Sequence, residues 1–171
     1  YMYFSKASGS MNDRTWMQLK AFDNDEADKF KFSIDWNGTK SSYNIIPKGN
    51  SSSYCLNKQG GNAGGFNSAS KTGDVQIYNG YNDEGSCWNF IAVTDYEWSL
   101  LPECFQVSTD ETIRYYRIQN KNFSSYYIKP GTTYVKTSNS TNEDDLNDMA
   151  WYFKEAGTNG FMQYYYIIHA A

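Results

Sequence analysis

The sequence of 171 residues predicts an all-β domain, built from three similar units of four short strands each. The first reason is an internal repeat, because residues 16–32 align without a gap with residues 74–90. A repeat of this length indicates one structural unit that is used several times. The second reason is that large apolar residues alternate with polar ones in many short segments, which is the period of a half-buried strand. The third is that the chain contains no convincing long helix.

The repeat rests on matches that are spread along its whole length. A third and more degenerate copy ends in residues 150–153, which again place two aromatic side chains two positions apart. We therefore expect every unit to close on a strand with an aromatic-x-aromatic pattern. The matching positions of the first two copies are Gln18 with Gln76, residues 24–26 with residues 82–84, and Phe30 and Phe32 with Trp88 and Phe90.

The strands of a unit follow one another in a fixed order. Each first strand opens with Tyr and continues with alternating large side chains, and a second short strand follows about ten residues later. The expected first strands are 43–46, 116–119 and 165–168, the second strands 1–4, 54–57 and 126–129, the third strands 17–20, 75–78 and 134–137, and the fourth strands 30–34, 88–91 and 151–154.

The last strand of the chain is of the first-strand type, so it completes the unit that begins at Tyr1. The two chain ends should therefore be neighbours, and the sheet should close without exposed edges that invite aggregation. The length suits one domain with a full core. We expect a single domain over residues 1–171, with units at 163–171 plus 1–40, at 41–95 and at 112–160.

Two insertions interrupt this pattern, and both are attached to the second unit. Residues 60–73 are rich in glycine and are expected to form a flexible loop. Residues 94–111 contain large apolar side chains and are expected to pack on the domain. The apolar side chains of this second insertion are Trp98, Leu100, Leu101 and Phe105.

Composition and charge exclude several classes of partner. The net charge is -4 and no run of Lys or Arg exists, so we expect no nucleic-acid partner. No stretch approaches about 18 apolar residues, so no transmembrane segment is expected. The three cysteines lack the spacing of a metal site, and Cys87 could pair with Cys104, which the sequence leaves open. The richness in Asn, Ser, Thr, Gly and Tyr is more typical of an exported domain.

Three segments of the second unit carry a resemblance to a known family. Residues 54–57 (Tyr-Cys-Leu-Asn), 73–78 (Gly-Asp-Val-Gln-Ile-Tyr) and 86–90 (Ser-Cys-Trp-Asn-Phe) resemble the repeat of the ricin-type lectins, whose pattern contains Cys-Leu-Asp, Val-Gln-Leu-Trp/Tyr and Gln-x-Trp-x-Phe. The sequence departs from that pattern at Asn57, where Asp is usual, and at Ser86, where Gln is usual. The resemblance implies a β-trefoil of twelve short strands.

The same resemblance implies a carbohydrate-binding site in the second unit. In this family the sugar lies in a shallow pocket of one repeat, where amide and carboxyl groups bind its hydroxyls and an aromatic ring covers its apolar face. Tyr, Asn, Gln and Asp meet both needs, because a buried hydroxyl without a partner is costly. The residues implied are Asn57, Gln76 and Tyr78, with Tyr81, Asn82 and Asp83 from the following loop.

A structural role is the alternative for most of these residues. Gln18 and Gln76 could simply tie strand backbones together. The repeated Asn-Asp-Glu could form a turn, since Asn and Asp bond their own backbone, although residues 24–26 also keep the first unit as a further candidate site. Tyr78 and Tyr81 could be ordinary surface tyrosines.

The resulting hypothesis is a non-catalytic, lectin-like module of an exported or cell-surface protein, bacterial in character, that binds a glycan or polysaccharide. No catalytic motif has recognisable spacing, the single histidine is His169, and we expect neither a cofactor nor a metal ion. The alternative is a β-trefoil that binds a protein partner or serves a structural role, including that of a protease inhibitor, without binding sugar.

Overall fold

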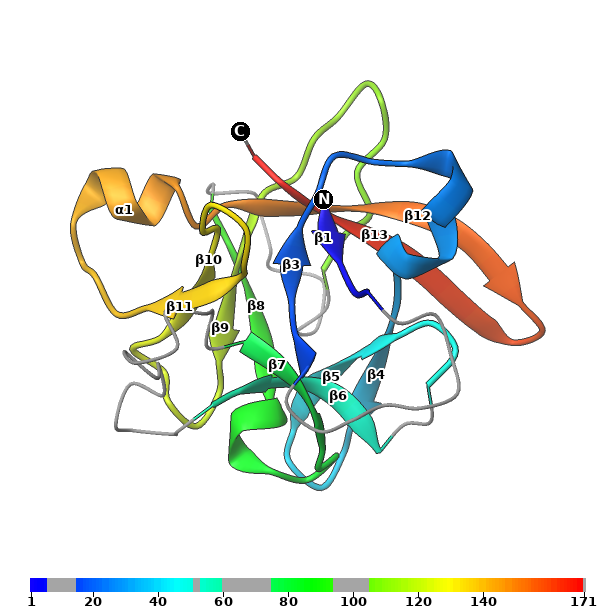
Figure 1. The fold of residues 1–171 in the computed structure, drawn as a ribbon. Coiled ribbons are helices and arrows are strands. Elements are labelled where there is room, and N and C mark those ends of the chain that lie inside the picture. The colour runs from blue at the N-terminus through cyan, green and yellow to red at the C-terminus, as the bar shows by residue number, and fades with distance from the viewer. Residues whose placement is uncertain (6–14, 51–52, 60–74, 94–104, 171) are drawn as a thin grey trace.

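The computed structural model describes residues 1–5, 15–50, 53–59, 75–93 and 105–170 (Figure 1). The expected all-β class is confirmed, because 47% of the structure is strand and 11% is helix. The thirteen strands are β1 (Met2–Tyr3), β2 (Thr15–Trp16), β3 (Gln18–Leu19), β4 (Lys31–Asn37), β5 (Ser42–Pro47), β6 (Tyr54–Lys58), β7 (Val75–Asn79), β8 (Trp88–Ala92), β9 (Tyr116–Asn120), β10 (Tyr127–Lys129), β11 (Lys136–Ser138), β12 (Trp151–Asn159) and β13 (Met162–His169). The helical elements among the described residues are the short 3-10 helices η1 (Asn24–Phe30) and η3 (Glu84–Ser86) and the α-helix α1 (Glu143–Asn147).

Six strands pair in a closed ring. Going round it, β9 pairs with β12, then β13, β4, β5 and β8 follow, and β8 pairs back to β9, all antiparallel. Burial alternates along β9, where Tyr116, Ile118 and Asn120 are buried, as expected for one inward face. Closure leaves these strands without a free edge where they meet.

Three hairpins, β1–β3, β6–β7 and β10–β11, complete the sheets. They meet at Met17, Val75 and Val135, whose side chains are all fully buried. The backbone N–H of Met17 donates to the Val75 carbonyl, and that of Val135 donates to the Met17 carbonyl, each at 2.9 Å. Met17 is therefore bonded to both Val75 and Val135, and the three hairpins are tied together at this point.

Two tryptophans connect the closed ring of strands to two of these hairpins. Trp88 Nε1 donates to the Leu56 carbonyl and Trp151 Nε1 donates to the Ile128 carbonyl, both at 3.0 Å. Both indoles are fully buried in the core, so these bonds remove two donors that would otherwise lie unpaired.

In the structure, the residue of the first unit that corresponds to Trp88 lies two positions later than the sequence alignment of the repeat places it. Trp88 pairs with Tyr43, and Trp151 pairs with Tyr116. The residue of the first unit that pairs in the same way, with Tyr165, is Phe32. The gapless alignment placed Phe30 at this position, which is wrong by two residues, although both rings are buried.

Part of the second insertion packs on the core as expected. The ring of Phe105 lies 4.4 Å from that of Phe153, 5.1 Å from that of Phe90 and 5.0 Å from that of Tyr165. The residues expected to pack beside it, Trp98, Leu100 and Leu101, lie outside the described residues, as do the insertion 60–73 and Cys104.

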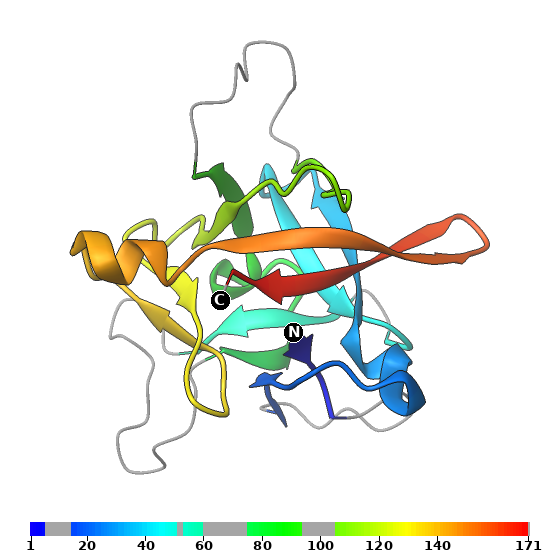
Figure 2. The ribbon, with the colours of Figure 1, turned by 90° about the horizontal axis from the view of Figure 1, so that it is seen from above.

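The two chain ends are neighbours, as expected (Figures 1 and 2). Tyr1 and His169 line one shallow cavity, and the rings of Tyr1 and Tyr166 lie 6.2 Å apart. The tip of the β12–β13 hairpin, at the other end of β13, projects beyond the other strands (Figure 2). No helix in the described part of the chain is long and apolar enough to span a membrane.

Candidate functional site

The first two residues of the predicted site are internal. Asn57 and Gln76 face each other across the β6–β7 pair, and their side chains are only 3% and 4% exposed. Asn57 Nδ2 donates to Asp83 Oδ1 at 2.8 Å and to Ser86 Oγ at 3.0 Å, and Gln76 Nε2 donates to Asn57 Oδ1 at 3.2 Å. Both amide hydrogens of Asn57 are therefore used to hold the turn that contains η3.

This turn fits tightly against β6. A Cβ atom on Gly85 would lie 2.5 Å from the carbonyl oxygen of Lys58 and 2.8 Å from Asn57 Nδ2, so only glycine allows this approach. Asp83 accepts a 2.9 Å bond from the Gly85 N–H and caps η3. The position of Asp83 is consequently fixed from two sides.

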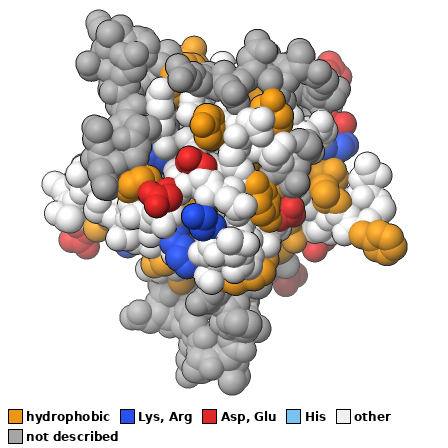
Figure 3. All heavy atoms as spheres, turned by 90° about the horizontal axis from the view of Figure 1, so that it is seen from below, with side chains coloured by type: hydrophobic (Ala, Val, Ile, Leu, Met, Phe, Trp, Pro, Cys, Tyr) orange, Lys and Arg blue, Asp and Glu red, His pale blue; other side chains and the backbone are white. Residues whose placement is uncertain are grey.

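Tyr78 and Asp83 flank Gly80 on the surface of the turn. A Cβ on Gly80 would lie 2.8 Å from the Tyr78 ring and 3.0 Å from Asp83 Cβ. Tyr78 is half-buried and Asp83 is exposed. Figure 3 shows the molecule from below, the side on which η3 lies in Figure 1, and acidic and basic side chains lie there beside hydrophobic ones.

Tyr81 and Asn82 are fastened to the β4–β5 hairpin. Asn37 Nδ2 lies 3.1 Å from the Tyr81 carbonyl and 3.0 Å from Asn82 Oδ1, and Asn44 Nδ2 donates to the Tyr81 carbonyl at 3.0 Å. The Tyr81 hydroxyl lies 3.5 Å from the carbonyl of Trp36. Burial raises the pKa of Tyr81, so its hydroxyl stays neutral at physiological pH.

The six predicted residues therefore form one connected cluster with two levels. Asn57 and Gln76 lie inside it and support the turn, whereas Tyr78, Tyr81, Asn82 and Asp83 reach its surface.

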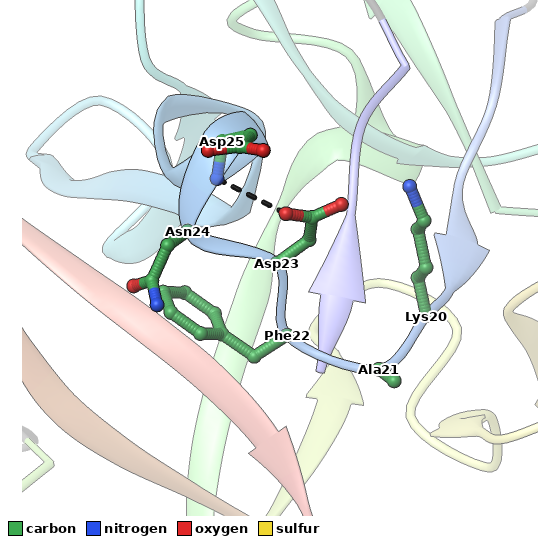
Figure 4. A pocket seen from close by; sticks show the side chains of 6 residues that line it. All are labelled: Lys20, Ala21, Phe22, Asp23, Asn24 and Asp25. Carbon is green, nitrogen blue, oxygen red and sulfur yellow. Dashed lines mark hydrogen bonds between the residues drawn. The ribbon is translucent and has the colours of Figure 1, made fainter.

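A cavity of about 560 Å³ lies at the equivalent turn of the first unit, lined by residues 20–25 (Figure 4). The two turns correspond because Gln18 faces Tyr3 in the β1–β3 pair as Gln76 faces Asn57 in the β6–β7 pair. Residues 20–25 thus take the place of residues 78–83.

Polar groups and one aromatic ring line this cavity. Figure 4 shows the Lys20 ammonium and the Asp23 carboxylate pointing to the same side, with the Asn24 amide beside the ring of Phe22. Asp23 Oδ1 accepts a 3.0 Å bond from the Asp25 N–H and caps η1.

The Phe22 ring is held by three other rings. It lies 5.1 Å from Tyr1, 5.1 Å from Phe30 and 5.2 Å from Tyr166. Such tilted and edge contacts fix the ring plane. The aromatic wall of the cavity is therefore preformed.

An ionic cluster adjoins the cavity at Glu26. Its carboxylate accepts from Lys20, from Lys29 at 2.7 Å and from the Tyr3 hydroxyl at 3.0 Å. The bond from Lys20, followed by those from Lys29 and Tyr3, lowers the pKa of Glu26 to about 2 from an ordinary 4.5. Reciprocally, the bond to Glu26 raises the pKa of Lys20.

The Glu26 cluster predicts a pH dependence of stability. Since the folded pKa is depressed, its contribution is present above pH 4.5 and is lost as the pH falls from 4.5 towards 2. We expect Glu26→Gln to unfold at lower urea concentration than the wild type at neutral pH, and the two midpoints to converge near pH 2. Urea titrations followed by circular dichroism over this range measure the difference. Parallel curves at every pH would show that Glu26 is not coupled to its lysines in the folded chain.

All three units begin a helical turn with the same cap. Asp23, Asp83 and Asn142 each accept a bond from the N–H two residues later. This is the ordinary role of Asp and Asn at a helix start. The repeated Asn-Asp-Glu therefore lies in a helical turn in both copies, at the start of η1 and around the cap of η3. In the first unit, Asn24 and Asp25 of this turn also line the cavity.

The sequence did not lead us to predict Lys20, Phe22 or Asp23 as binding residues. The repeat itself contained the signal, because it aligns residues 20–25 with residues 78–83. Among the described residues, no group of three or more His, Cys, Asp or Glu could hold a metal ion. Cys55 and Cys87 carry free, buried thiols, and burial raises the pKa of Cys55 to about 11.

Comparison with protein-family models, with curated proteins and with solved structures finds no match for this chain.

Proposed function

We propose that this chain is a β-trefoil domain that binds carbohydrate without catalysing a reaction. The trefoil is supported by the closed ring of six strands and by three hairpins, one from each repeat. The bonds that link Met17, Val75 and Val135 and the repeated indole bonds of Trp88 and Trp151 follow the same three-unit order.

The observation that carries the binding function is the cavity at residues 20–25. It offers a carboxylate, an amide and an ammonium group beside a fixed phenyl ring. A sugar ring needs these two kinds of contact, because its hydroxyls require hydrogen-bond partners and its C–H face packs on an aromatic ring. A volume of about 560 Å³ is enough for one or two sugar rings.

The second unit supplies a second candidate surface of the same design. Here Tyr78 stands at the position aligned with Lys20 and Asp83 caps η3 as Asp23 caps η1, while Asn57 and Gln76 support the turn from inside. Two weak sites in one domain would raise the avidity for a repetitive polysaccharide. Such a ligand fits an exported or cell-surface module, which is the setting we propose.

A glycan array tests this function. The array should carry defined oligosaccharides of glucose, galactose, mannose and N-acetylglucosamine, and the purified domain should be applied beside Asp23→Asn, Tyr78→Ala and the control Glu155→Gln. Asn caps helices as well as Asp does, so Asp23→Asn removes the charge and keeps the fold. We expect selective binding that falls about tenfold or more in Asp23→Asn, because charge-assisted bonds are roughly twice as strong as neutral ones.

The other outcomes are equally informative. Loss in Tyr78→Ala alone would assign binding to the second unit. Equal signals in all variants would remove both turns from consideration. Absence of binding by a folded domain would contradict the carbohydrate function.

A protein-interaction module is the second candidate function. The observation that favours it is the tip of the β12–β13 hairpin, where Phe161 is fully exposed and Met162 is 43% exposed. No charged residue occurs between Ala156 and Ile168. An apolar tip of this kind suits insertion into a pocket of another protein.

A further inference from the structure

A second aromatic surface lies on the β4–β5 hairpin, away from the cavity of the first unit. Trp36 is 49% exposed, whereas the other ring-strand tryptophans, Trp88 and Trp151, are fully buried. Trp36 faces Tyr43 directly in the strand register, and their rings lie 5.1 Å apart at 65°. Exposing this much of an indole leaves a large apolar area in contact with water.

The ring of Tyr43 connects Trp36 to a small cavity. Tyr43 lies 5.3 Å from Phe90, and Phe90 lines a cavity of about 210 Å³. The other lining residues are Ser41, Asn89, Ile91 and Lys121. Three aromatic rings therefore lead from an exposed indole to a hollow with both polar and apolar walls.

The surroundings of this surface are fixed before any ligand arrives. Lys121 Nζ donates to the Ser41 carbonyl and ties the β4–β5 turn to the end of β9. At the other end, the carbonyl of Trp36 lies 3.5 Å from the Tyr81 hydroxyl. Binding would then lose little conformational entropy at the surface.

The chemistry of this surface favours a sugar over an apolar protein segment. Three of the five lining residues are polar, namely Ser41, Asn89 and Lys121. An apolar side chain would offer no hydrogen bond to the Asn89 amide or the Ser41 hydroxyl. An oligosaccharide can instead offer the hydroxyls of one ring to Asn89 and Ser41 while the C–H face of the neighbouring ring covers the indole. The cavity is small enough to admit a single ring.

We propose that Trp36 and the cavity beyond Tyr43 form a further carbohydrate-binding site, the Trp36 site, in which Trp36 stacks on one sugar ring and Asn89, Ser41 and Lys121 bind the hydroxyls of the next. The Trp36 site rests on the proposed carbohydrate function but shares no residue with the cavity at residues 20–25. It would bind an extended oligosaccharide at a place separate from that cavity.

The test uses the same array of glucose, galactose, mannose and N-acetylglucosamine oligosaccharides. The wild-type domain is compared with Trp36→Ala, Trp36→Tyr, Asn89→Ala and Asp23→Asn, and circular dichroism verifies that each variant is folded. We expect Trp36→Ala to weaken a subset of signals by about tenfold or more and Trp36→Tyr to keep them, because a smaller aromatic ring still stacks. Those signals should survive in Asp23→Asn.

The pattern of losses separates the two proposals. If no signal falls in Trp36→Ala while some are lost in Asp23→Asn, the Trp36 site is overturned and the cavity at residues 20–25 stands. If signals are lost in Trp36→Ala and Asn89→Ala while none falls in Asp23→Asn, the Trp36 site stands and the cavity at residues 20–25 is overturned. A folded wild-type domain that binds no arrayed oligosaccharide would overturn both.

Discussion

Replacing Trp88 by alanine is expected to lower the free energy of unfolding by about 3–5 kcal/mol, the usual range for removing a buried aromatic side chain. Trp88 is fully buried, and its indole N–H donates to the Leu56 carbonyl at 3.0 Å. The substitution opens a cavity where the ring of strands meets the β6–β7 hairpin, and it leaves the Leu56 carbonyl without this donor. Urea unfolding followed by far-ultraviolet circular dichroism measures the change.

The matched control is Trp36→Ala, because the same atoms are removed from a half-exposed site. Its expected cost is about 1 kcal/mol or less, since little packing is lost there. A third variant, Trp88→Phe, keeps most of the ring and loses the hydrogen bond, so it should fall between the two. Equal losses at Trp88 and Trp36 would contradict the burial on which this prediction rests.

Replacing Asn57 by alanine is expected to cost about 2–3 kcal/mol of stability, because buried polar groups lose their partners. The substitution removes the bonds to Asp83 and Ser86 and deprives Gln76 Nε2 of its acceptor. Gln76 Oε1 already lies buried without a hydrogen-bond partner in the described structure, so Gln76 would be left with a second unpaired atom. Urea unfolding measures the loss, and Asn139→Ala, at an exposed position, is the control.

This experiment also separates support from ligand contact. If Asn57 acts from inside the turn, stability falls and any glycan binding at the first unit is retained in the folded fraction. If the variant is as stable as the wild type but loses binding, Asn57 contacts the ligand directly. The latter result would require the turn to open, because both amide hydrogens of Asn57 are engaged.

The departure from the ricin-type pattern at Asn57 has a physical explanation in this structure. Asn57 Nδ2 lies 2.8 Å from Asp83 Oδ1. An aspartate in its place would bring two carboxylates within hydrogen-bonding distance, and like charges so close disfavour ionisation of both. The amide instead donates to Asp83, which in turn caps η3. Asn at position 57 is therefore the residue that can donate to Asp83 and leave Asp83 free to cap η3.

The sequence predicts strands well here because the signal for a strand is local. Alternation of buried and exposed side chains can be read within five residues, and β9 shows it as predicted. The alignment of the first unit fails for an equally clear reason. The helical turn η1 spans seven residues, whereas η3 spans three, so a gapless alignment cannot follow the chain from the turn into the next strand.

At the candidate site, local sequence patterns predict the turn but not the burial of its side chains. The sequence locates the turn at residues 78–83, but it does not tell which side chains of the cluster face water. Asn57 is buried because Asp83 and Ser86 fold back on it. Tyr81 is anchored by Asn37 of the neighbouring unit and by Asn44 of its own unit. These contacts join residues 26 to 44 positions apart.

By itself, the sequence determined the all-β class, most of the strands and the meeting of the two chain ends, because periodicity and internal similarity are properties of the chain. Only the tertiary structure decided that the cavity lies in the first unit, at residues 20–25, and that Asn57 and Gln76 support a turn from inside. The reason is that burial and cavity shape depend on which distant segments pack together, and the hydrogen bonds of a single side chain such as Asn57 are set by that packing.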